Sequence, residues 1–210
     1  AYVLHDRTSF KKFLQKRAGV ENPPDFGIYL SNLRCFVTFE DSGLGTFAHE
    51  IMHPLVRANL PHTPTWAGEG LPSFFEKGFG HWNGQDMVLH LGYQNPWRIK
   101  ELGDRLGSLD LKDIVTASER HGTSEKRLVS VFLYSQGRLK AFIDLVQRNR
   151  KNGYETFVEA AFNRRFPDIQ PLWSAYLRAI LADRNAVLQI PATEVLETRD
   201  AFTEFMRTHN

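Results

Sequence analysis

Two histidines and a glutamate stand close together in the run His49-Glu50-Ile51-Met52-His53. Residues four apart on a helix lie on one face, a turn above each other, so His49 and His53 can bind the same metal ion. Glu50 lies one step around the helix, where its carboxylate can face a metal-bound water without binding the metal. This spacing predicts a zinc site in which Glu50 is the general base.

The residues around this run are apolar. The alternative to a metal site is a surface helix that carries two hydrated histidines. Burying two histidines beside a glutamate costs free energy unless another group compensates them, and a metal ion is such a group. The apolar neighbours therefore favour the metal site; they are Phe47, Ala48, Ile51, Met52, Leu55 and Val56.

A third ligand is expected because catalytic zinc sites use three protein ligands and one open position, and two histidines with one glutamate form a known set. Glu69 stands in the segment Trp66–Leu71, at the expected start of an apolar helix. An acidic residue there would also complement the helix dipole without binding a metal. The upstream histidine pair favours Glu69 as the ligand. We expect one Zn²⁺ per chain, although other divalent ions could occupy such a site in vitro.

Two segments, Gly45–His53 and Trp66–Glu76, resemble the gluzincin metallopeptidases, the clan that includes thermolysin and the aminopeptidase N family. A third segment, Tyr134-Ser135-Gln136-Gly137, is similar to the Tyr-x-Lys-Gly segment of the aminopeptidase N family. The resemblance covers about residues 26–146 and is closest in character to small bacterial-type gluzincin domains of unassigned substrate. It implies a zincin-like fold, with these roles for single residues: zinc ligands His49, His53 and Glu69, general base Glu50, and oxyanion stabiliser Tyr134.

The resemblance implies a zinc-dependent peptide hydrolase that acts on a peptide or protein substrate. The two expected strands lack the Gly-x-Met-Glu-Asn motif with which the aminopeptidase branch grips a free amino terminus, so an endopeptidase is favoured over an aminopeptidase. The main alternative is a catalytically silent zinc-binding interaction domain of gluzincin fold. A structural zinc site and hydrolysis of a non-peptide amide are further alternatives.

Two residues keep a second interpretation. Tyr134 is either the oxyanion stabiliser or a core tyrosine on an amphipathic helix. Glu76 lies on the same expected helical face as Glu69, so it either orients a ligand histidine from behind or is a hydrated surface residue.

The periodicity of apolar residues predicts an α+β fold. We expect one catalytic domain over residues 1–210, with a strand-containing N-terminal lobe of about 1–92 that carries the metal helix and a mostly helical C-terminal lobe of about 93–210. Strands are expected at 26–30 and 34–39, and a hairpin at 81–92 with Asn83-Gly84 as its turn. The expected helices are 8–18, 46–58, 68–77, 124–150, 154–162 and 171–182.

The composition excludes several classes of protein. Of 210 residues, 42% are hydrophobic and 24% charged, and the net charge of +2 contains no basic block, so we expect no nucleic-acid partner. No apolar run reaches the length of a membrane span. Cys35 is the single cysteine, which rules out an internal disulfide and a multi-cysteine zinc site. Ala1 is an unusual first residue; if it follows a removed segment, the protein is expected outside the cytoplasm. The oligomeric state stays open.

Overall fold

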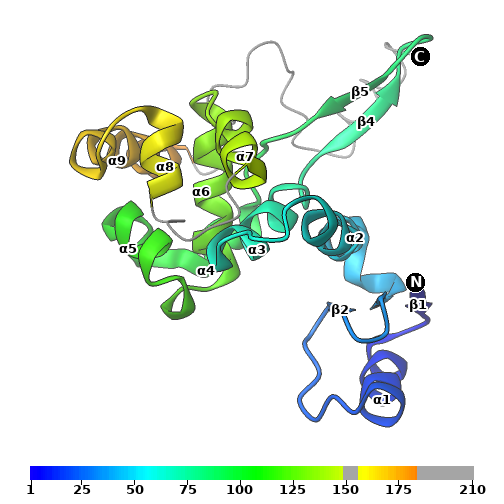
Figure 1. Cartoon of the computed structure of the whole chain (residues 1–210). Helices are drawn as coiled ribbons and strands as arrows, with labels where there is room; N and C mark the ends of the chain where they lie inside the picture. Colours follow the sequence, from blue (N-terminus) through cyan, green and yellow to red (C-terminus); the bar gives the residue numbers. More distant parts are fainter. Residues whose placement is uncertain (149–155, 184–210) are drawn as a thin grey trace.

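The computed structural model describes residues 1–148 and 156–183, and within them the chain has the expected α+β fold (Figure 1). The strands are β1 (Tyr2–Leu4), β2 (Gly27–Leu30), β3 (Cys35–Phe39), β4 (Phe79–Trp82) and β5 (Met87–His90). The first helices are α1 (Arg7–Ala18), α2 (Gly43–Asn59), α3 (Thr65–Phe74), α4 (Pro96–Leu102) and α5 (Leu111–Thr116). They are followed by α6 (Thr123–Ser135), α7 (Leu139–Arg148), α8 (Thr156–Phe162) and α9 (Phe166–Ala182), and three short 3₁₀ segments are Glu40–Ser42, Gly103–Ser108 and Ser118–Arg120.

The N-terminal sheet has the strand order β1-β3-β2. Strand β3 pairs in parallel with β1 and antiparallel with β2, in a register that places Tyr29 opposite Phe36. Helix α1 covers this sheet and begins at a cap, because the Asp6 carboxylate accepts a hydrogen bond from the backbone N–H of Ser9. The sheet and α1 share a small apolar core, and β2 is one of the two edge strands. That core consists of Phe10, Leu14, Leu30, Val37 and Phe39.

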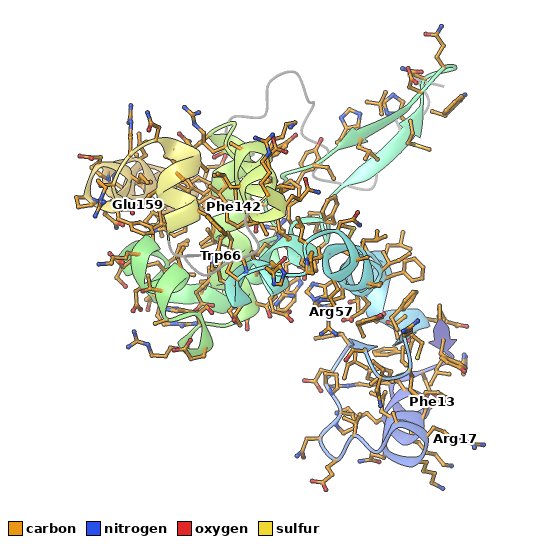
Figure 2. All side chains as sticks on the ribbon, viewed as in Figure 1. Phe13, Arg17, Arg57, Trp66, Phe142 and Glu159 are labelled. Atoms are coloured by element: carbon orange, nitrogen blue, oxygen red, sulfur yellow. The ribbon has the colours of Figure 1, made fainter. Side chains whose placement is uncertain are left out.

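Helix α2 lies between this sheet and the larger helical core, as Figure 1 shows. On one side the ring of Phe47 meets that of Phe36 edge to face, with 5.1 Å between the centroids. On the other side Val56 belongs to the apolar cluster that α3 to α9 build. In that cluster the rings of Trp66 and Phe142 lie 5.0 Å apart (Figure 2). The helix predicted at 46–58 is confirmed as α2, which runs without interruption through Pro54.

The segment after α2 agrees with the predictions in type but differs at its boundaries. Helix α3 begins at Thr65 and ends at Phe74, so Glu69 lies within it and Glu76 lies beyond its end. The predicted hairpin is present as β4 and β5. Its turn is longer than the predicted Asn83-Gly84 pair, because the side chain of Asn83 accepts hydrogen bonds from the backbone N–H groups of Gln85 and Asp86.

The single helix predicted for 124–150 is wrong. Two helices, α6 and α7, stand in its place, and the break is at Gly137, whose φ of 64° is left-handed. The N–H of Arg138 bonds to the carbonyl of Leu133, which ends α6 in a tight cap. Both helices bury apolar residues in one core. The apolar periodicity of the sequence therefore continues past the point at which the helix breaks.

The last two helices agree with the predictions in part. Helix α8 matches the prediction for 154–162 from Thr156 onward, since residues 154 and 155 lie outside the described part. Helix α9 starts at Phe166, before the predicted start at Pro171, and accommodates this proline in its interior. The tail after Asp183 also lies outside the described residues.

None of the helices in the described ranges is long and apolar enough to cross a membrane.

The close packing of α3 against α6 predicts opposite effects for two neighbouring glycines of α3. A Cβ at Gly70 would lie 2.5 Å from the carbonyl oxygen of Lys126, whereas a Cβ at Gly68 would meet nothing within 4 Å. Gly70→Ala should therefore destabilise the protein by about 1–3 kcal/mol. The control Gly68→Ala should be neutral or stabilising by up to about 1 kcal/mol, because alanine favours helices. Urea unfolding of both variants tests this, and an equal loss in both would contradict the close contact.

Candidate metal site

The nitrogen and oxygen atoms of three side chains converge where α2 crosses α3. The Nε2 atoms of His49 and His53 lie 3.1 Å apart. Oε2 of Glu69 lies 3.6 Å from Nε2 of His49, and Oε1 of Glu69 lies 4.0 Å from Nε2 of His53. One such atom from each residue falls within 4.8 Å of the others. Tetrahedral ligands about 2.1 Å from a zinc ion are roughly 3.4 Å apart, so a small movement would bring these three onto one ion.

His49 is held in place from behind by two acceptors. Its Nδ1 lies 3.1 Å from Oε1 of Glu76 and 3.1 Å from the hydroxyl oxygen of Ser73. The Ser73 hydroxyl itself donates to the carbonyl of Glu69, so toward the imidazole it is an acceptor. A proton on Nδ1 satisfies both acceptors and leaves Nε2 as the free lone pair that points at His53 and Glu69. This is the tautomer that binds a metal, and the carboxylate behind it increases its basicity.

The carboxylate of Glu76 is buried and bound by cations and an amide. Arg98 donates to both of its oxygens, at 2.5 and 3.1 Å, and the side-chain amide of Asn95 donates at 2.9 Å. Nε of the buried Arg127 lies 3.9 Å away. Burial favours the neutral carboxyl, but hydrogen bonds from His49 and Arg98 and the two guanidinium charges outweigh it, and the pKa of Glu76 falls to about 2.

Arg127 connects this network to the backbone. It is 1% exposed, and it donates from Nε to the carbonyl of Ser73 and from Nη2 to the carbonyl of Tyr93. Its guanidinium therefore fixes the end of α3 and the segment after the hairpin, which are the two stretches on either side of Glu76.

Glu50 is buried next to the converging atoms. Gly27 of β2 allows this approach, because a Cβ there would lie 2.9 Å from Cγ of Glu50. The carboxylate oxygen Oε2 is buried and makes no hydrogen bond within the described part of the chain. Burial and the charge of Glu69 raise the pKa of Glu50 to about 7, against the opposing effects of His49 and the backbone N–H of Tyr29. A buried carboxylate oxygen without a partner costs free energy, so Oε2 can accept a proton or a hydrogen bond from a ligand.

The two imidazoles are so close that they do not readily carry a positive charge at the same time. Burial opposes the charged form of His49, but hydrogen bonds to Glu69 and Glu76 outweigh it and raise its pKa to about 9. Burial lowers the pKa of His53 to about 4, where the charges of His49 and Arg57 add to the effect and Glu69 opposes it. A divalent cation that binds the Nε2 atoms of both rings would replace the proton that His49 otherwise holds toward Glu69.

An open cleft of about 960 Å³ contains these groups. Its walls come from the edge strand β2, from the exposed face of α2, and from the start of α4. The volume is sufficient for several residues of an extended peptide or for a small organic ligand. Besides residues already described, the lining of the cleft includes Phe26, Ile28, Tyr29, Arg57, Lys77 and Trp97.

Four of the five residues predicted for the site lie together: His49, Glu50, His53 and Glu69. The fifth, Tyr134, lies on α6 with its ring 5.1 Å from that of Phe74, and it is not among the described residues that line the cleft. The oxyanion role of Tyr134 stays a prediction. For Glu76, the orienting position is observed and the hydrated surface position is not.

Several residues around the site were not predicted. Ser73 lies one turn after Glu69, so helical periodicity could have identified it. Asn95 and Arg98 follow the hairpin, and Arg127 lies on α6; no local spacing connects them with the histidines. They reach the site only through the tertiary fold.

The buried charge of Glu76 should contribute much more to stability than an exposed charge on the same partner. Glu101 also lies near Arg98, at 3.7 Å, but its side chain is 48% exposed. In metal-free protein at pH 7, Glu76→Gln should lower the free energy of unfolding by about 2 kcal/mol or more, because Arg98 and Arg127 lose their buried counter-charge. Glu101→Gln should cost less than about 1 kcal/mol. Urea unfolding with a chelator present measures both, and equal values would argue against the network.

No protein-family model matches this chain, and neither does any curated protein or solved structure. The function must therefore be argued from the chemistry of the site and from the resemblance of its motifs.

Proposed function

We propose that this protein is a zinc-dependent peptide hydrolase of zincin-like fold. In this proposal His49, His53 and Glu69 bind one zinc ion and Glu50 is the general base. The observation that carries it is the convergence of three ligand atoms beside a buried, unpaired carboxylate oxygen. A purely structural site would not need that fourth group, because a carboxylate without a partner adds only cost.

Two features of the site support zinc. The donor set of two imidazoles and one carboxylate is the one that catalytic zinc sites use with an open position. Glu76 and Ser73 both face Nδ1 of His49, so they hold its Nε2 toward the ion. Cys35 lies on β3, and within the described residues no fourth ligand joins the group, so a position remains for water or substrate.

The chain's own residues then divide the hydrolysis between them. A zinc ion bound here would act as the Lewis acid that acidifies water and polarises the scissile carbonyl. Glu50 accepts the proton of the attacking water at its carboxylate and delivers it to the leaving amine. Burial of Glu50 and His49 limits the access of bulk water to the carboxylate that exchanges the proton.

The edge strand β2 supports a peptide as the substrate. Its partner β3 lies on one side, and its other side borders the cleft through Phe26, Gly27, Ile28 and Tyr29. Such an edge can pair with an extended peptide through backbone hydrogen bonds and place its carbonyl beside the metal. The cleft continues past the site toward Trp97 and Thr123. This extent favours an endopeptidase over an enzyme that holds a chain end.

Metal content tests the ligand set. The wild-type protein should bind about one zinc per chain, and Glu69→Gln should lose it or bind it at least tenfold more weakly, because one of three ligands is removed. Glu119→Gln removes an exposed glutamate outside the cleft and should bind like wild type. Elemental analysis after dialysis, followed by zinc titration, gives both values. Wild-type protein that takes up no zinc would refute the proposal.

The role of Glu50 predicts a separation of binding from catalysis. Glu50→Gln should retain about one zinc per chain and lose about 10²–10⁴-fold in kcat, because the amide cannot accept the proton. The measurement is turnover of a peptide library by zinc-loaded protein, with metal content determined on the same samples. Full activity in the variant would remove Glu50 from the mechanism. A wild type that binds zinc and cleaves nothing would point to the silent zinc-binding domain.

A further inference from the structure

Arg57 lies one helical turn beyond His53, on the face of α2 that carries the ligand histidines. Positions 49, 53 and 57 follow each other at intervals of four, so their side chains form one row along the cleft. Arg57 is exposed and lines the cleft together with both histidines. Its distance along the helix from His53 is about 6 Å, from four residues at 1.5 Å each.

Aromatic packing holds the guanidinium of Arg57 over the edge strand. Its central carbon lies 5.5 Å from the centre of the Tyr29 ring, and that ring stacks on His53 with 6.4 Å between centroids. A guanidinium can stack on an aromatic face and still present its N–H groups outward. Tyr29 thus keeps the cation beside the strand that borders the cleft.

The carboxylates of the cleft are already engaged elsewhere. Asp25 pairs with Arg7 and Lys11, and Glu76 pairs with Arg98. Glu69 faces the two histidines, and Glu50 is buried two helical turns before Arg57. Within residues 1–148 and 156–183, no carboxylate forms an ion pair with Arg57. Its N–H donors therefore face the cleft without a negative partner from the described chain.

We propose that Arg57 binds a carboxylate of the substrate and makes the site selective for acidic peptides. This inference rests on the proposed function. A planar guanidinium can bind both oxygens of a carboxylate at once. Because an extended peptide advances about 3.3 Å per residue, the carboxylate would lie about two residues from the scissile bond. It is either the side chain of Asp or Glu or the C-terminal carboxylate of a short peptide.

Matched peptides test the selectivity. Internally quenched octapeptides with Asp or Asn at one position each would be assayed with zinc-loaded protein. At one position, about two residues from the cleaved bond, Asp should give about tenfold higher kcat/KM than Asn, because the added contact is a charge-assisted hydrogen bond. Tetrapeptides with a free or an amidated C-terminus, assayed by amine release, show whether the terminal carboxylate can replace the side chain. The preference should shrink at 0.5 M salt.

Variants assign the preference to Arg57. Arg57→Gln should reduce the Asp-to-Asn ratio to about one, and Arg57→Glu should favour Lys at the same position. Arg17→Gln removes the same charge from α1, far from Arg57 in Figure 2, and should keep the wild-type ratio. Equal ratios in wild type and Arg57→Gln would overturn the inference, as would the absence of any preference between acid and amide forms in the wild type.

A binding measurement separates this inference from the proposed function. Calorimetry of the same peptides with zinc-loaded Glu50→Gln protein needs no turnover. Tighter binding of Asp than Asn peptides, lost in Glu50→Gln/Arg57→Gln, would support the carboxylate site even if the wild type hydrolyses nothing. Hydrolysis without an Asp preference would overturn the carboxylate site and leave the hydrolase proposal intact. If no peptide binds and none is cleaved, the inference fails together with the proposal.

Discussion

The buried carboxylate of Glu76 is the interaction on which the arrangement of the site depends. It accepts hydrogen bonds from His49 on α2, from Asn95 immediately before α4 and from Arg98 on α4, and it faces Arg127 of α6. An unpaired charge at this depth would be strongly destabilising, so α2, α4 and α6 must stand where they can compensate it. The same geometry that satisfies this carboxylate also sets the tautomer and direction of His49. The same contacts therefore stabilise the fold and orient His49 as a candidate metal ligand.

Apolar packing fixes the positions of the helices that carry this polar network. Helix α2 contacts the small sheet core through Phe47 and the large helical core through Val56, so its rotation is fixed from two sides. Helix α3 is fixed by the contact of Gly70 with the α6 backbone. Because His49 and His53 share one helix and Glu69 lies on another, their convergence depends on this crossing. Hydrophobic burial supplies the main driving force, and the hydrogen bonds select one arrangement.

Features whose residues lie close together in the sequence could be predicted, and features that join distant segments could not. The histidine pair and Glu50 lie within five residues of one helix, so periodicity alone predicted their relation. Glu69 needed a second helix, and its place there was predicted although α3 begins at Thr65 and not at Gly68. The division of 124–150 into α6 and α7 was missed, because the apolar stripe continues past Gly137. Arg98 and Arg127 could not be predicted, since only tertiary folding brings them to Glu76.

The distribution of charge in the cleft explains why two residues stand apart from the rest. Asp25, Glu69 and Glu76 have partners that stabilise their charge within the chain. Oε2 of Glu50 is buried without a hydrogen bond, and Arg57 is a cation with no counter-ion in the described chain. A fold selected for stability alone would pair or replace the buried Glu50 oxygen, because its burial without a partner costs free energy, whereas the exposed Arg57 is free to bind an anion. Both border the same cleft, one turn or less from the ligand histidines. In the proposed mechanism, a ligand that brings a proton to Glu50 and a negative charge to Arg57 uses both groups.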